Sequence, residues 1–72
     1  MNKQRYTVEI VSLTAETQYY PDCSKREATR IARAEAAREG ERQVYVSWVR
    51  CSDGQQGYLN ANGDHVITGS PW

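Results

Sequence analysis

Apolar and polar residues alternate over Arg5–Leu13, the first of the segments with a regular pattern. Tyr6, Val8 and Ile10 fall on one face of an extended chain, and the positions between them are polar, as in a strand with one buried face. The alternation breaks at Val11, which has the opposite parity. Either a β-bulge turns the end of this strand or both of its faces are partly covered there. The polar residues 14–22 that follow include a proline and are predicted to form a loop.

A single helix is predicted over Ser24–Glu39. Ser24 and Glu27 have the spacing of a capping box, in which the serine accepts from the N3 amide and the glutamate reaches back to the cap. Gly40 is a natural stop for this helix. Its small apolar face, which can approach a sheet closely, comprises Ala28, Ile31, Ala32 and Ala36. Glu35 falls in the middle of that face, so it lies either at a boundary or buried with a partner.

Three further strands are predicted in the second half of the chain. They are Gln43–Cys51, Gln56–Ala61 and Asp64–Thr68. The first has the strongest β pattern, because both of its faces carry β-branched or aromatic residues. A turn at residues 52–55 follows it, and Asn62-Gly63 favours a type I′ hairpin turn, which needs positive φ at both positions. Gly69–Trp72 is predicted to form a tail.

These elements predict one α+β domain, residues 1–72, with the order β-α-β-β-β. One helix packs on one face of a mostly antiparallel sheet of three or four strands. The pattern leaves open whether the first strand pairs in parallel with the second through a crossover or docks at the far edge. The alanine face of the helix is expected to bury the sheet residues Tyr6, Val8, Ile10, Val44, Val46, Trp48, Leu59 and Ile67.

Composition narrows the classes of function. The chain has 72 residues, with nine Lys and Arg against nine Asp and Glu. This size and neutrality exclude a multidomain enzyme and a strongly basic nucleic-acid tail, and we expect no signal peptide and no membrane contact. A small secreted domain with a thin core usually carries more bridges than Cys23 and Cys51 could form, so we expect reduced thiols in a cytoplasmic protein. The alternative is a single disulfide between them.

We expect no catalytic site, cofactor or metal. His65, the only histidine, follows a turn and has no partner at a recognised catalytic spacing. Cys23 precedes the helix, where a thiol pKa can be lowered, and the alternative is a buried, unreactive thiol.

The sheet face away from the helix is the first candidate site. By parity it carries Tyr45 and Val49, and Tyr58 joins them if the hairpin register allows. A partly apolar face that one helix leaves uncovered favours contact with a second copy or another protein, although its aromatic residues also suit the stacking of RNA bases. Trp72 either closes the core or anchors a partner. The first hypothesis is therefore a non-catalytic protein-binding domain, homodimeric through this face.

The second candidate site is a group of three arginines on the helix. Arg26, Arg30 and Arg33 fall within about 60° of one another, opposite the alanines. A cation in the first turn opposes the helix dipole, so this arrangement does not serve helix stability. The structural alternative is an ordinary solvated helix face. The second hypothesis is a nucleic-acid-binding accessory protein whose arginines contact phosphates.

Overall fold

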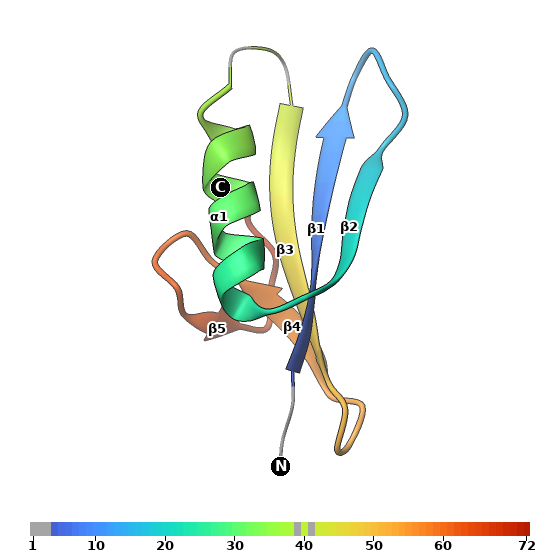
Figure 1. The fold of residues 1–72 in the computed structure, drawn as a ribbon, viewed down its shortest axis with the longest axis vertical. Helices are drawn as coiled ribbons and strands as arrows, with labels where there is room; N and C mark the ends of the chain where they lie inside the picture. The colour runs from blue at the N-terminus through green and yellow to red at the C-terminus, as the bar shows by residue number, and fades with distance from the viewer. Residues whose placement is uncertain (1–3, 39, 41) are drawn as a thin grey trace.

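The computed structural model describes residues 4–38, 40 and 42–72 (Figure 1). The elements in this part of the chain are β1 (Gln4–Ser12), β2 (Gln18–Cys23), α1 (Lys25–Ala36), β3 (Arg42–Arg50), β4 (Gln56–Leu59) and β5 (His65–Val66). The strands form one antiparallel sheet of order β2-β1-β3-β4-β5. The α1 helix packs on one face of this sheet, against β1, β2 and β3. The predicted α+β class, with one helix on an antiparallel sheet, is confirmed.

The two central strands carry most of the core. β1 and β3 pair without interruption from Gln4 opposite Arg50 to Ser12 opposite Arg42. Because directly opposite residues share a face, the apolar residues of both strands point together towards α1. The sheet residues that are buried there as predicted are Tyr6, Val8, Ile10, Val44, Val46, Trp48 and Leu59. Cys23 of β2 joins them. Ile67 was also expected in this core, and that prediction is wrong: β5 ends at Val66, and Ile67 is 87% exposed.

The segment predicted to be a loop, residues 14–22, contains most of strand β2, so the sheet has one strand more than predicted. β2 is an edge strand whose residues are exposed except for Cys23, and its sequence therefore shows no alternation. The β-bulge lies here rather than at Val11. The register with β1 shifts between Tyr6 and Val8, and Asp22 has a φ of 57°. A bulge on an edge strand is a position that tolerates Pro21.

This additional strand decides where β1 lies. β1 and β2 form a hairpin that reverses the chain, α1 reverses it again, and β3 then returns antiparallel to β1 (Figure 1). β1 therefore occupies the second position of the sheet, between β2 and β3. Neither expected placement, a parallel crossover or the far edge, is correct.

Ser24 caps α1 as expected. Its hydroxyl accepts a hydrogen bond from the Glu27 amide at 3.1 Å and donates one to the Glu27 carboxylate at 3.1 Å. Ala28 and Ala32 are fully buried, while Ile31 packs at the margin of the core.

The helix ends earlier than predicted. Its last residue is Ala36, which is exposed rather than buried, and Ala37 forms the C-cap. The Arg38 amide then donates to the Glu35 carbonyl in a tighter turn. Gly40, with a φ of 127°, lies beyond this turn. The predicted end at Glu39 lies outside the described residues.

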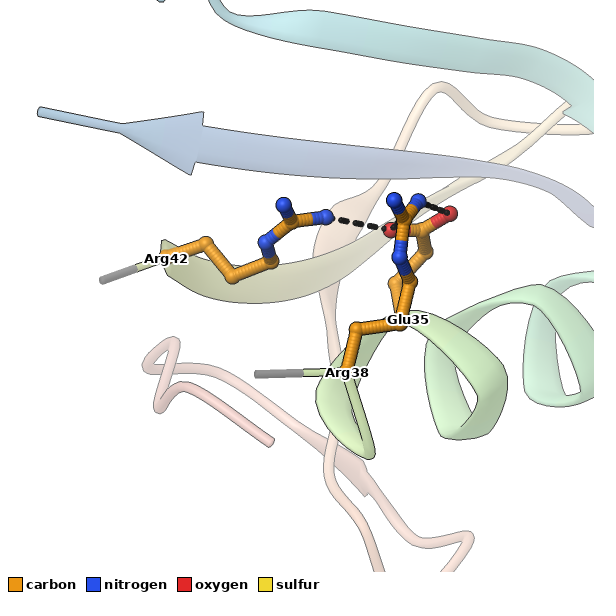
Figure 2. A network of polar contacts seen from close by, with 3 residues as sticks. All are labelled: Glu35, Arg38 and Arg42. Atoms are coloured by element: carbon orange, nitrogen blue, oxygen red, sulfur yellow. Dashed lines mark hydrogen bonds and ion pairs between the residues drawn. The ribbon is translucent and has the colours of Figure 1, made fainter. Parts of the chain in front are cut away.

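Glu35 joins the end of α1 to the start of β3 (Figure 2). Only 14% of its side chain is exposed. Arg42 Nη1 donates to Glu35 Oε2 at 2.9 Å, and Arg38 Nη1 donates to both carboxylate oxygens at 3.3 Å. A largely buried carboxylate requires such partners, because an unpaired charge away from water is costly. Both sequence alternatives thus describe part of the result: Glu35 lies at the helix end, and it is largely buried with partners.

The last hairpin differs from the predicted type I′ turn. Gly63, with a φ of 89°, donates its amide proton to the Asn60 carbonyl at 2.9 Å, whereas Asn62 does not have positive φ. Asn60 Oδ1 also accepts from the amides of Asn62 and Asp64. These bonds form a three-residue loop, so β4 ends at Leu59 rather than Ala61. β3 and β5 also end before the predicted Cys51 and Thr68.

The C-terminal tail returns to the core. The Trp72 amide donates to the Val44 carbonyl, and its indole Nε1 donates to the Leu59 carbonyl, both at 2.9 Å. Val44 lies beyond the part of β3 that pairs with β4, so the tail bonds to β3 where β4 has ended. The half-buried indole packs against the core, next to the sheet face that α1 covers.

We expect Trp72→Ala to lower the free energy of unfolding by about 2 kcal/mol, because it removes apolar packing and the indole hydrogen bond. Urea denaturation followed by circular dichroism measures this change. Ile67→Ala is the matched control, since Ile67 belongs to the same end of the chain but is exposed, and its effect should stay within about 0.5 kcal/mol. Equal losses in both variants would contradict the packing of Trp72 on the core.

Candidate interaction surface

The register of the strands arranges the sheet face opposite α1 in four rows, of which the row of Val11 opposite Gln43 lies at one end. The central row consists of Thr7, Ser47, Tyr58 and Val66, each directly opposite the next. The Arg5 row consists of Arg5, Val49 and Gln56. The Glu9 row consists of Tyr19, Glu9 and Tyr45. The three rows from Arg5 to Glu9 are called the open face.

A depression of about 400 Å³ lies on the open face. It extends over the central row and the Arg5 row, where the small side chains of Thr7 and Ser47 lie beside the larger Val49 and Tyr58. Ile67, the exposed residue that follows β5, borders the depression. The open face therefore combines a hollow with apolar side chains.

Three of the four predicted contact residues lie on the open face. Tyr45 and Val49 are half-buried, and the hairpin register places Tyr58 opposite Ser47. Trp72 lies apart from them, packed against the core. The structure thus brings together the residues selected by parity and separates the one selected for its position in the tail.

Local contacts hold two of these tyrosines in place. The Tyr45 hydroxyl donates to Gln43 Oε1 at 2.9 Å. Gly69 lies against the ring of Tyr58, since a Cβ built at this glycine would be only 2.8 Å from Tyr58 Cε1. The tail therefore covers part of Tyr58.

Tyr19 and Arg5 were not predicted to lie on this surface, nor Ile67 at its border. Tyr19 was assigned to a loop, and its place on the open face follows only from its pairing with Glu9. Ile67 was assigned to the core. Arg5 received no role, although its parity matches that of Thr7 and Glu9 and was the available signal.

The arginine stripe, which consists of Arg26, Arg30 and Arg33, lies on the outer side of α1. All three side chains are exposed and, with Lys25 and Thr29, border a shallow depression of about 650 Å³. Among the described residues, none of the three forms an ion pair. The arginines that do pair with carboxylates are Arg38, Arg42 and Arg50.

His65 packs at the edge of the core, beside Tyr6 and Trp48, where α1 does not reach. Its Nε2 lies 2.6 Å from the Tyr6 hydroxyl, and its ring stands edge-on to Trp48 at 5.4 Å between centroids. Although part of the residue remains exposed, burial of the imidazole lowers the pKa of His65, and the charges of Lys25 and Arg50 act in the same direction. The imidazole is therefore neutral at neutral pH and bonded to the core.

The two cysteines are free thiols in different surroundings. Cys23 is buried and donates a hydrogen bond to the Tyr20 carbonyl at 3.3 Å, whereas Cys51 is exposed. Burial raises the pKa of Cys23, and the charges of Glu27 and Asp22 raise it further. The alternative of an activated thiol at the helix start is wrong.

Two further features concern residues 4–38, 40 and 42–72, the part of the chain that the structure describes. No group of three or more His, Cys, Asp or Glu side chains is placed there to hold a metal ion. The one helix of this part of the chain is too short and too polar to cross a membrane. Comparisons with models of protein families, with curated proteins and with solved structures found no match.

We expect stability to fall as the pH is lowered through the range in which His65 titrates. The folded-state pKa is below the ordinary value of 6.5, so the unfolded chain binds this proton first. The stability that neutral His65 contributes is thus fully present above pH 6.5 and is lost as the pH falls from there to the folded-state pKa. Urea denaturation of the wild type and of His65→Gln measures the effect. The variant should lose this part of the pH dependence. Identical plots of unfolding free energy against pH for the wild type and the variant would contradict the assignment of this effect to His65.

Proposed function

We propose that this protein is a non-catalytic protein-binding domain and that the open face is its binding surface. One observation carries the proposal: the sheet has five strands and α1 lies on only one of its faces. The other face presents Tyr45, and beside it a depression that is lined by Val49 and Tyr58 and bordered by the exposed Ile67. Exposed apolar groups of this kind, rich in tyrosine, are typical of protein interfaces.

The mode of binding follows from the edges of the sheet. Addition of a partner strand needs a regular edge with free amides and carbonyls. β2 carries Pro21 and a bulge, and β5 is only two residues long. Both edges thus suit strand addition poorly. The proposed binding therefore uses side-chain packing across the open face, with an apolar partner group in the depression.

We place this function in the cytoplasm. The free thiols of Cys23 and Cys51 support that location, because an oxidising compartment favours bridged cysteines in domains of this size.

Tyr45→Ser should weaken binding at least tenfold, because interface tyrosines carry much of the binding energy. The same variant should change the free energy of unfolding by less than about 1 kcal/mol, because Tyr45 lies outside the core. Immobilised wild type, Tyr45→Ser and the helix control Arg33→Ser are compared for proteins captured from a lysate of the source cell and for self-association. The expected result is a set of interactions retained by wild type and the control and lost by Tyr45→Ser.

A monomeric wild type that captures no protein, or capture that Tyr45→Ser leaves intact, would overturn the proposal. Urea denaturation of each variant separates lost binding from lost folding.

The arginine stripe supports a second candidate function, that of a nucleic-acid-binding accessory protein. Three exposed cations without ion pairs among the described residues form a surface that fits a row of phosphates. Because the chain as a whole has no net charge, nucleic-acid binding of this kind would use only this face of the helix.

For this second function, the joint substitution Arg30→Ala and Arg33→Ala is the test. Fluorescence anisotropy with a single-stranded oligonucleotide gives the affinity over a range of salt concentrations. Loss of two phosphate contacts should make the slope of log affinity against log salt shallower by about 1.4. Arg5→Ala, on the opposite side of the sheet, is the control. Unchanged affinity and slope in the double variant would contradict this function.

A further inference from the structure

Two residues of opposite charge lie symmetrically about the central row of the open face. Arg5 and Glu9 belong to β1 and lie two residues before and after Thr7, so each is about 7 Å from the central row. Within the described part of the chain, neither forms an ion pair. Glu9 is half-buried and flanked by Tyr19 and Tyr45, a position where a carboxylate gains from a nearby cation.

A two-fold axis makes this arrangement self-complementary. Consider two copies whose open faces are turned towards each other, with a two-fold axis midway between the sheets and parallel to the central row. A half-turn about this axis places β1 of one copy over β1 of the other, with the two strands running in opposite directions. Arg5 of each copy then faces Glu9 of the other copy, so two ion pairs form at once, as in an isologous interface. The same operation places Tyr45 opposite Val49, because these residues pair with Glu9 and Arg5 within each sheet.

The shape of the open face also fits this half-turn. The depression lies over the central row and the Arg5 row, while the Glu9 row carries two tyrosines. The half-turn exchanges the Arg5 row and the Glu9 row, so the tyrosine row of each copy meets the hollow of the other, and the Val11–Gln43 row lies beyond the matched rows. The strands of the two sheets then remain nearly antiparallel, as in aligned sheet packing, where strand directions stay within about 30°.

The face is also large enough for such a contact. β1 and β3 have nine residues each and are about 30 Å long. An interface of ordinary size takes about 800 Å² from each partner, which is roughly a sixth of the 5191 Å² surface of this chain. We infer that the occupant of the open face is a second copy of this chain, related by this two-fold axis; the inference rests on the proposed function of that face.

Reversal of the two charges tests the symmetry. Arg5→Glu and Glu9→Arg each place two like-charge pairs in the dimer, so each variant alone should dimerise at least about tenfold more weakly than wild type. An equimolar mixture of these two variants restores both pairs and should form a one-to-one heterodimer of near wild-type affinity. The chain that carries both substitutions should again form a homodimer. Sedimentation equilibrium measures all of these, and Arg33→Glu on α1 is the control that should dimerise like wild type.

Three results would overturn the inference: a wild type that is monomeric at millimolar concentration, single variants that dimerise like wild type, or a mixture no tighter than its components. Urea denaturation identifies a single variant that fails to fold, and the doubly substituted chain then supplies the decisive comparison. If the wild type is monomeric but Tyr45→Ser still abolishes capture of another protein, this inference fails and the proposed function stands. If capture is also absent, both fail.

Discussion

One helix of 12 residues has to cover a five-stranded sheet, and the rest of the structure follows from that constraint. The α1 helix is about 18 Å long, whereas β1 and β3 extend for about 30 Å. The helix therefore covers the middle of one face and leaves the other face open. Its small residues, Ala28 and Ala32, bring it close to the central strands and allow a short helix to exclude water there. Glu35 then ties the end of α1 to the first residue of β3.

The remainder of the covered face is closed by aromatic side chains rather than by a second helix. Trp48 lies so close to Gly57 that a Cβ at this position would be 2.7 Å from the ring, and its Nε1 donates to the Tyr58 carbonyl. Tyr6 and His65 continue this cover, and Trp72 closes the flank beyond the end of β4. On the opposite face the tail at Gly69 lies against Tyr58, but no helix or aromatic cluster of the described residues covers the rest. That asymmetry is why the open face, and not a sheet edge, is the proposed binding surface.

The sequence predicted those parts of the structure in which one face is buried and the other is not. The hydrophobic pattern predicted β1 and β3 and seven of the core residues. Parity also predicted that Tyr45 and Val49 lie on the open face, where the structure has them. β2 was missed because an edge strand exposes both faces and has no alternation to detect. The same omission concealed the position of β1, since only a hairpin before α1 makes β3 antiparallel to it. Asn60 ended β4 early through side-chain hydrogen bonds that the Asn62-Gly63 pair does not reveal. The pairing of Arg5 with Val49 and of Glu9 with Tyr45 depends on the continuous register of β1 with β3, which residue spacing alone does not provide.

The central claim is that the open face is buried against a second copy in solution. Tyr45 and Val49 belong to one strand and lie about 13 Å apart within a chain, too far for a nuclear Overhauser contact between them. Isotope-filtered spectroscopy on an equimolar mixture of labelled and unlabelled protein detects contacts between copies only. The account predicts cross-peaks from the Tyr45 ring protons of one copy to the Val49 methyl groups of the other. Contacts between copies that involve only α1, or none at millimolar concentration, would contradict it.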